Sequence, residues 1–236
     1  MKHLVLALQF LTRLPLPPVE ADARDFAAAM RWFPVAGLAV GATVAMPWWL
    51  LYARDPWLGA LAGLTGWVAM TGALHLDGLG DVADGAGAAH RGRERLSAVM
   101  ADPHVGSFAV VVIVLQLIAK LVLLHAIPAD KVAALVVVPV LARIAPIAWS
   151  LFLPPLHDGL GTRFRSGVGR WHLAVWATMA IGIASALAPA LLVLFPAAAI
   201  WGLWLKTRLG GISGDGHGAG IELVETALLL ALVLGA

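Results

Sequence analysis

Long apolar stretches recur along almost the whole chain and are separated by short polar connections. Each stretch is close to the roughly 20 residues that an α-helix needs to cross about 30 Å of hydrocarbon. We interpret about seven of them as transmembrane helices, the last three being short: residues 32–53, 56–74, 107–127, 132–153, 173–187, 190–205 and 221–235. The pattern predicts an all-α fold, a polytopic integral membrane helical bundle that forms one domain over residues 1–236.

The composition agrees with a chain that is solvated mainly by lipid. Of its 236 residues, 61% are hydrophobic and only 13% are charged, too few to cover an ordinary water-facing surface. Many of the ten tryptophans, such as Trp48 and Trp171, stand near the ends of apolar stretches, where the membrane interface favours indole rings. The absence of cysteine excludes disulfides, thiolate metal sites and a cysteine nucleophile. A net charge of +2 without a basic stripe argues against nucleic acid as a partner.

Basic residues predict which side of the membrane carries the polar loops. With seven crossings, the longer polar segments all fall on one side: residues 1–31, 75–106, 154–172 and 206–220. Most lysines and arginines lie in these segments, whereas the opposite loops hold only Arg54 and Lys131. By the positive-inside rule, the side with more lysines and arginines faces the cytoplasm, and the membrane is a cell inner membrane. An even number of crossings would move the later loops to the other side. The first 11 residues are too short to span, and we expect an interfacial helix there.

The segment HLDGLGDVADGAG, residues 75–87, is the first candidate for chemistry. Asp77, Asp81 and Asp84 are spaced so that a helix would place all three carboxylates on one face. Three anions at such short range repel one another, so the arrangement favours a bound Mg²⁺ or Mn²⁺ ion, which prefers oxygen ligands. A solvated acidic loop between two spans is the alternative interpretation.

The same polar segment continues into a basic stretch. Arg91, Arg93 and Arg95 suit phosphate oxygens, but they could equally set the membrane topology and contact anionic lipid. Asp102 could complete a metal shell. His104 could transfer a proton or contact phosphate, although a lone histidine more often does neither.

A glycine-rich segment, KTRLGGISGDGHGAGIELVE, occupies residues 206–225. We expect its glycines to form a loop whose backbone amides can cradle phosphate, although the segment is not a Walker A loop. Glu222 and Glu225 share a face at the start of the last predicted span, where acidic residues are commonly functional. A plain glycine-rich linker is the alternative.

Two further charges lie inside predicted spans. Lys120 can reach the membrane surface by extending its side chain. Arg143 stands nearer the middle of its span, so we expect it to require a buried anionic partner.

Taken together, these motifs resemble those of the cobalamin synthase family, the adenosylcobinamide-GDP ribazoletransferases of late vitamin B12 (cobalamin) biosynthesis. The resemblance covers nearly the full length. It rests on FLTRLP at residues 10–15, WFPVAGL at 32–38, HLDGLGDVADG at 75–85, MADPHVG at 100–106, DGLG at 158–161 and GGISGDGHGAGIELVE at 210–225. It implies a single membrane-embedded transferase domain.

The resemblance implies a specific reaction. A hydroxyl of α-ribazole, or of its 5′-phosphate, attacks the cobinamide-linked phosphate of adenosylcobinamide-GDP, and GMP leaves. Mg²⁺ is the expected cofactor, because phosphoryl transfer depends mainly on positioning and on positive charge around the diphosphate.

The reaction suggests roles for the candidate residues. The predicted metal ligands are Asp77, Asp81, Asp84 and Asp102. The predicted catalytic residues are Asp77, Asp81 and His75, with the base that accepts the hydroxyl proton left open between His75 and an aspartate. The predicted substrate-binding residues are Arg91, His104, Arg143, Lys206, Gly210, Gly211, Ser213, Asp215, Glu222 and Glu225.

Two rival interpretations remain at this point. A CDP-alcohol phosphotransferase also holds metal on aspartates at a membrane surface, but Asp84-Gly85 does not continue into that family's signature. A corrinoid transporter subunit would place its polar groups at mid-membrane, whereas most ionisable residues here lie in the loops. The oligomeric state stays open, with a homo-oligomer as one option.

Overall fold

The computed structural model describes residues 1–88, 104–156 and 159–235. Within these ranges the chain is helical, without a β-strand, as predicted. The α-helices are α1 (Lys2–Leu11), α2 (Ala23–Ala29), α3 (Phe33–Tyr52), α4 (Pro56–Thr71), α5 (Leu74–Ala88), α7 (Ser107–Ala126), α8 (Val132–Ala142), α9 (Ala145–Phe152), α10 (Leu160–Gly167), α11 (Arg170–Leu187), α12 (Leu194–Trp204) and α13 (Gly214–Leu234).

The helices support a protein with several membrane crossings. Within the described residues, five helical stretches are long and apolar enough to span: Ala23–Tyr52, Ser107–Ala126, Ala129–Phe152, Pro189–Leu209 and Gly214–Leu234. A sixth results if α4 and α5, which are bent by 83°, count as one broken span. This number is close to the predicted seven. The remaining expected span, 173–187, corresponds to α11, which is not among the candidate spans and begins with the polar residues Arg170 and His172.

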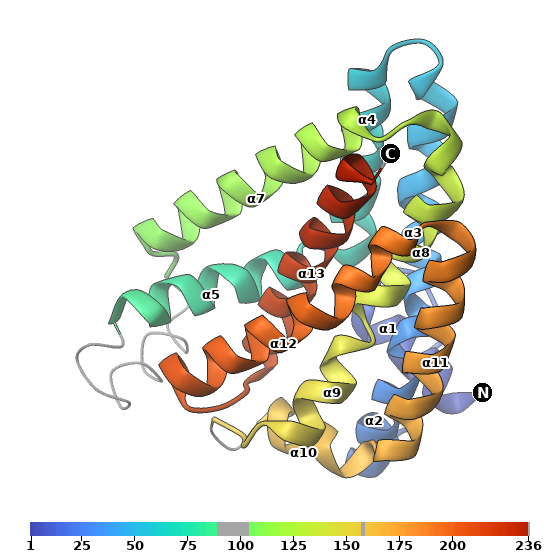
Figure 1. Cartoon of the computed structure of the whole chain (residues 1–236). Coiled ribbons are helices and arrows are strands. Elements are labelled where there is room, and N and C mark those ends of the chain that lie inside the picture. The colour runs from blue at the N-terminus through green and yellow to red at the C-terminus, as the bar shows by residue number, and fades with distance from the viewer. Residues whose placement is uncertain (89–103, 157–158, 236) are drawn as a thin grey trace.

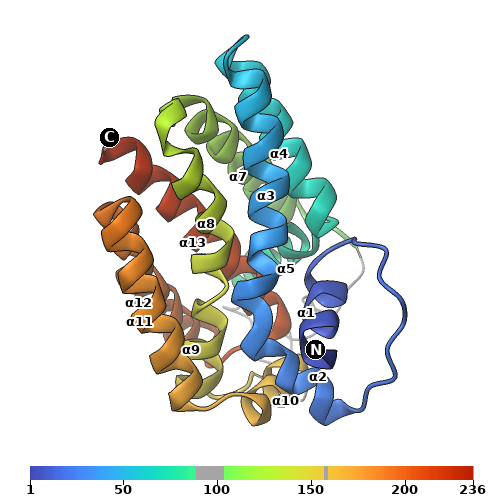
Figure 2. The same ribbon diagram turned by 90° about the vertical axis from the view of Figure 1, so that its right-hand side faces the viewer.

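The connections divide between the two ends of the bundle (Figures 1 and 2). One end carries α2, α10 and the connection that precedes α13. The other carries the α3–α4 connection, the α7–α8 connection and the C-terminus. The predicted topology likewise places α2, α10 and the connection before α13 on one side of the membrane.

A sharp bend between α4 and α5 sets the direction of the acidic helix. Gly72 ends α4 in the left-handed conformation with φ 60°, and Ala73 follows with φ 59°. Glycine adopts this conformation freely, whereas alanine does so at a cost of about 1 kcal/mol. The backbone N–H of Arg13 donates to the carbonyl of Met70 at 2.7 Å, which ties the segment after α1 to the bend. As a result α5 runs across the bundle below α7 rather than along α4 (Figure 1).

The two motif helices, α5 and α13, pack closely because glycines line their contact. A Cβ atom at Gly78 would lie 3.0 Å from the backbone of Asp215. A Cβ atom at Gly218 would lie 3.4 Å from the Cα atom of His75. Small residues at these positions let the backbones approach, as they do in other membrane helix pairs.

The prediction of a glycine-rich loop is wrong for residues 214–220, which form the first turns of α13. Ser213 starts the helix, since its Oγ accepts a hydrogen bond from the Gly216 N–H at 3.0 Å. Contact with α5 then compensates for the weak helix propensity of glycine. The last helix therefore begins seven residues earlier than the predicted span.

Candidate active site

The acidic residues of α5 lie beside the start of α13. The Asp81 carboxylate interacts electrostatically with Asp215 of α13 and with Asp77 and Asp84 of its own helix. Asp77 is exposed, and the other three are partly buried. Carboxylates this close repel one another, so a cation that binds among them is stabilised. The fold thus joins the two motifs that the sequence separates by more than a hundred residues.

The chemistry of this group fits Mg²⁺, because carboxylate oxygens are the ligands that the ion prefers. The side chains nevertheless do not converge: among the described residues, no group of three or more His, Asp or Glu side chains is arranged to hold a metal ion. Asp102, the fourth predicted ligand, lies outside the described residues. The magnesium site therefore stays a prediction.

Asp84 has a structural role that the sequence did not reveal. Its Oδ2 accepts a hydrogen bond from the Gly106 N–H at 2.7 Å, and its Oδ1 accepts one from the Ala109 N–H at 3.1 Å. Gly106 is the N-cap residue of α7 and has no side chain to cap that helix. Asp84 thus provides the missing acceptor and a negative charge at a helix N-terminus. A Cβ atom at Gly106 would collide with this carboxylate, which accounts for the glycine.

We expect replacements of Asp84 to separate capping from charge. Asp84→Ala should lower the free energy of unfolding by about 1 kcal/mol, the usual loss when a capping acceptor is removed. Asp84→Asn keeps an oxygen acceptor and should lose less. Thermal unfolding of both variants in detergent, without substrate, provides the measurement. Both variants remove the same charge beside Asp81, so equal stability of Asp84→Ala and Asp84→Asn would rule out the capping role.

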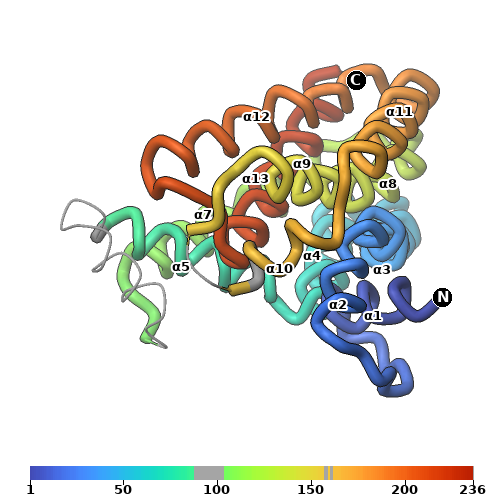
Figure 3. Tube along the Cα trace, turned by 90° about the horizontal axis from the view of Figure 1, so that it is seen from below, coloured from blue at the N-terminus to red at the C-terminus, as the bar shows by residue number. Residues whose placement is uncertain are grey.

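A cavity of about 110 Å³ lies between α1, α3, α5, α10 and α13. Figure 3, viewed along the bundle from the α10 end, shows the backbones of the five helices that supply the lining residues. Its apolar wall includes Phe10, Phe33 and Phe164, whose rings contact one another with centroids 5.5–5.9 Å apart. Asp77 and Asp215 belong to the same lining. The cavity is therefore lined both by aromatic side chains and by two members of the acidic cluster, which consists of Asp77, Asp81, Asp84 and Asp215.

Two buried imidazoles also line this cavity. His75 Nδ1 lies 3.5 Å from Arg143 Nη2. Because a guanidinium group only donates, Nδ1 must be the acceptor, which places the proton of a neutral ring on Nε2. This Nε2 atom is buried and has no hydrogen-bond partner.

The second imidazole belongs to His217. Its Nε2 lies 3.3 Å from Ser150 Oγ, while its Nδ1 is buried without a hydrogen-bond partner. Buried polar groups are normally hydrogen-bonded, so unpartnered ones on residues that line a cavity indicate a place for a ligand.

A network of buried charges lies deeper in the bundle. Lys120 Nζ contacts Glu222 Oε2 at 2.7 Å and Glu225 Oε2 at 2.6 Å. Arg143 Nη1 donates to Glu225 Oε1 at 2.8 Å. Gln116 Nε2 donates to Glu222 Oε2 at 2.9 Å. The buried anionic partner predicted for Arg143 is confirmed, and it is Glu225.

This network changes how the predicted substrate-binding residues are understood. Arg143 and Glu225 are fully buried, Glu222 is 2% exposed, and these three side chains do not line the cavity. Their charges compensate one another inside the bundle, so their direct contacts are with the protein. His75 contacts Arg143 of this network and also lines the cavity.

The remaining predicted residues divide between structural positions and the surface. Gly210 adopts φ 89° at the turn after α12. Gly211 packs on the backbone of Pro154 and Leu156, where the Ile212 N–H donates to the Pro154 carbonyl at 2.9 Å. Ser213 caps α13, as described above.

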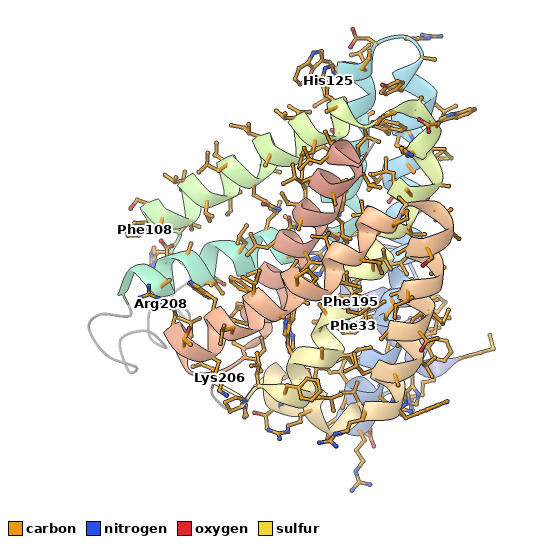
Figure 4. The ribbon with its side chains drawn as sticks, viewed as in Figure 1. Phe33, Phe108, His125, Phe195, Lys206 and Arg208 are labelled. Carbon is orange, nitrogen blue, oxygen red and sulfur yellow. The ribbon has the colours of Figure 1, made fainter. Side chains whose placement is uncertain are left out.

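Two predicted phosphate-binding residues, His104 and Lys206, are described by the structure, and neither lines the cavity. His104 is exposed. Lys206 lies at the surface (Figure 4), on the lining of a separate apolar groove of about 540 Å³ between α9, α11 and α12. Arg91 lies outside the described residues.

The aromatic wall and His217 were not singled out from the sequence. Phe10 and Phe33 belong to the FLTRLP and WFPVAGL motifs, and His217 stands between two glycines of the last motif. A polar residue within a packed glycine run is a signal that could have indicated the imidazole. No spacing rule joins phenylalanines from α1, α3 and α10.

Comparisons with known proteins cover nearly the whole chain. A family model described as cobalamin-5-phosphate synthase matches residues 3–233. A protein of Novosphingobium aromaticivorans is 55% identical, with 99% of this chain and 97% of the relative covered. Relatives in Thiobacillus denitrificans and Laribacter hongkongensis are each 50% identical; the matches cover 98% and 99% of this chain and 94% and 97% of the relatives. All three are named adenosylcobinamide-GDP ribazoletransferase. No solved structure matches the chain.

Proposed function

The chain belongs to the cobalamin-5-phosphate synthase family, and on this premise we propose that it is an adenosylcobinamide-GDP ribazoletransferase. A hydroxyl oxygen of α-ribazole, or of its 5′-phosphate, forms a bond to the cobinamide-linked phosphorus. The bond from that phosphorus to the GMP oxygen breaks, and GMP leaves with the electron pair. The products are adenosylcobalamin, or its 5′-phosphate, and GMP.

The observation that carries this proposal is the meeting of α5 and α13 beside one cavity. Phosphoryl transfer needs a nucleophile and a diphosphate to be held in line, with compensation for negative charge. Asp77 and Asp215 line the cavity, and Asp81 interacts electrostatically with both. When bound by these carboxylates, Mg²⁺ would supply positive charge to the diphosphate. Asp102 remains a proposed further ligand, and Arg91, His104 and Lys206 remain proposed phosphate contacts.

The geometry narrows the choice of general base. In its neutral form, with the Nδ1 lone pair directed to Arg143, His75 carries a proton on Nε2 and has no second lone pair to accept another. We therefore assign the hydroxyl proton to a cavity carboxylate, Asp77 or Asp215. For His75 we propose a role as hydrogen-bond donor rather than as the base.

The placement of the active site follows from the basic residues. Helix α10 and the connection that precedes α13 lie at the same end of the bundle as α2 (Figure 1). The sequence segments that form this end hold most of the lysines and arginines. We propose that the protein resides in the inner membrane and that this end, with the cavity, faces the cytoplasm.

A direct assay tests the function. Purified protein given adenosylcobinamide-GDP, α-ribazole and Mg²⁺ should release one GMP for each α-ribazole consumed, and none when either substrate is omitted. A CDP-alcohol phosphotransferase would instead release CMP from a CDP-linked alcohol. Movement of labelled corrinoid across proteoliposomes without GMP formation would favour the transporter and contradict the proposal.

A further inference from the structure

We propose that the phenylalanine-walled cavity is the binding site for the benzimidazole ring of α-ribazole, with His75 Nε2–H donating a hydrogen bond to the ring nitrogen that carries no sugar. This inference rests on the proposed function and assigns a place in the protein to one of its two substrates.

The aromatic, apolar character of the wall suits a flat, mostly apolar ring system. Phe33 and Phe164 are each 2% exposed, and Phe10 packs against both. Aromatic rings of a ligand gain from edge and face contacts with such side chains beyond the burial of their area. The cavity of about 110 Å³ is somewhat smaller than the roughly 150 Å³ that holds a benzene molecule. A two-ring base therefore requires a wall side chain to move, and Phe10 is the least buried of the three.

The polar groups match the single acceptor of this ring. In α-ribazole one benzimidazole nitrogen bears the ribose, and the other has a free lone pair. His75 is 2% exposed and lines the cavity, and its Nε2 atom is a buried donor without a hydrogen-bond partner. A hydrogen bond between them would satisfy both groups.

Guanine, the other flat base among the substrates, matches the cavity less well. Its edge presents several donors and acceptors, and each would lose water on entering a pocket walled by phenylalanine. The ribose of a bound α-ribazole would extend toward Asp77 and Asp215, which line the same cavity. Its hydroxyl would then lie near the carboxylates proposed to position the reaction.

The first test uses the wild-type protein and measures binding directly. Isothermal titration in nanodiscs compares α-ribazole with an analogue in which the free ring nitrogen is replaced by C–H. We expect the analogue to bind at least about tenfold more weakly, because the buried donor would remain unpartnered. Equal affinities would overturn the hydrogen bond.

The second test removes the donor. His75→Phe keeps a flat ring of similar size, and we expect it to raise the KM for α-ribazole about tenfold and to abolish the preference for α-ribazole over the analogue. The KM for adenosylcobinamide-GDP should stay within about twofold of the wild-type value. His125→Phe is the matched control, since His125 stacks on Trp57 at the opposite end of the bundle (Figure 4) and should leave both KM values unchanged.

A third variant keeps the inference testable if His75→Phe does not fold. Phe164→Leu reduces the aromatic wall and should weaken the binding of α-ribazole and of the analogue equally.

If GMP is released but His75→Phe and Phe164→Leu raise the KM for adenosylcobinamide-GDP instead, the cavity holds guanine and the inference is overturned. If the wild type releases no GMP, the proposed function itself fails, which the binding measurement distinguishes from failure of the cavity assignment.

Discussion

Asp81→Asn abolishes GMP release while the protein stays folded in detergent: this is the expected result for the residue at the centre of the acidic cluster. Asp81 is the carboxylate that interacts with Asp77, Asp84 and Asp215 together. Asparagine has nearly the same shape but is neutral, so it weakens the site for a divalent cation. Loss of several kcal/mol of transition-state stabilisation corresponds to a rate decrease of about 10³-fold or more. Asp77→Asn should behave similarly.

Stability gives the Asp81 prediction a second readout. Removing one of several mutually repelling carboxylates should leave the thermal midpoint without Mg²⁺ unchanged or higher, since repulsion is relieved. The increase in midpoint that added Mg²⁺ gives the wild type should shrink or disappear. Asp130→Asn, in the exposed α7–α8 connection, is the matched control and should change neither readout. Full activity of Asp81→Asn would remove this residue from the metal site.

Hydropathy alone locates most helices of this bundle, because lipid demands long apolar segments with internally satisfied backbones. The predicted span 107–127 coincides with the helix Ser107–Ala126, and 32–53 coincides with Phe33–Tyr52. The boundary that hydropathy misplaces most is the start of α13, which begins at Gly214 rather than at residue 221. There a polar, glycine-rich stretch is helical only because α5 packs against it, and a single sequence does not reveal that contact.

In the candidate site, too, some features could be predicted from the sequence and others depend on contacts between helices. The requirement of Arg143 for an anion follows from the energetic cost of a lone charge in a membrane, which holds whatever the fold. The cap that Asp84 provides for α7 joins residues 22 positions apart and depends on how two helices meet. Spacing could indicate that Asp77, Asp81 and Asp84 share a face. It could not indicate that one of them would be engaged by backbone amides.

Glu225→Gln should lower the free energy of unfolding by about 3 kcal/mol, the second large effect that we expect. Glu225 is fully buried and contacts both Lys120 and Arg143. The variant leaves two buried cations with Glu222 as the remaining anion of the network, and an uncompensated buried charge is strongly destabilising. Unfolding of the purified protein in mixed micelles by increasing denaturant provides the measurement.

A double-mutant cycle separates charge balance from the loss of packing. Lys120→Met alone should also destabilise, since it leaves two buried carboxylates with Arg143 as the one remaining cation of the network. The double variant Lys120→Met/Glu225→Gln restores a neutral network of Arg143 and Glu222, so its loss should be smaller than the sum of the single losses by at least about 1 kcal/mol. The surface pair Asp130–Lys131, 3.8 Å apart, is the control and should show coupling below about 0.5 kcal/mol. Additive losses at Lys120 and Glu225 would mean that charge compensation does not hold this part of the bundle together.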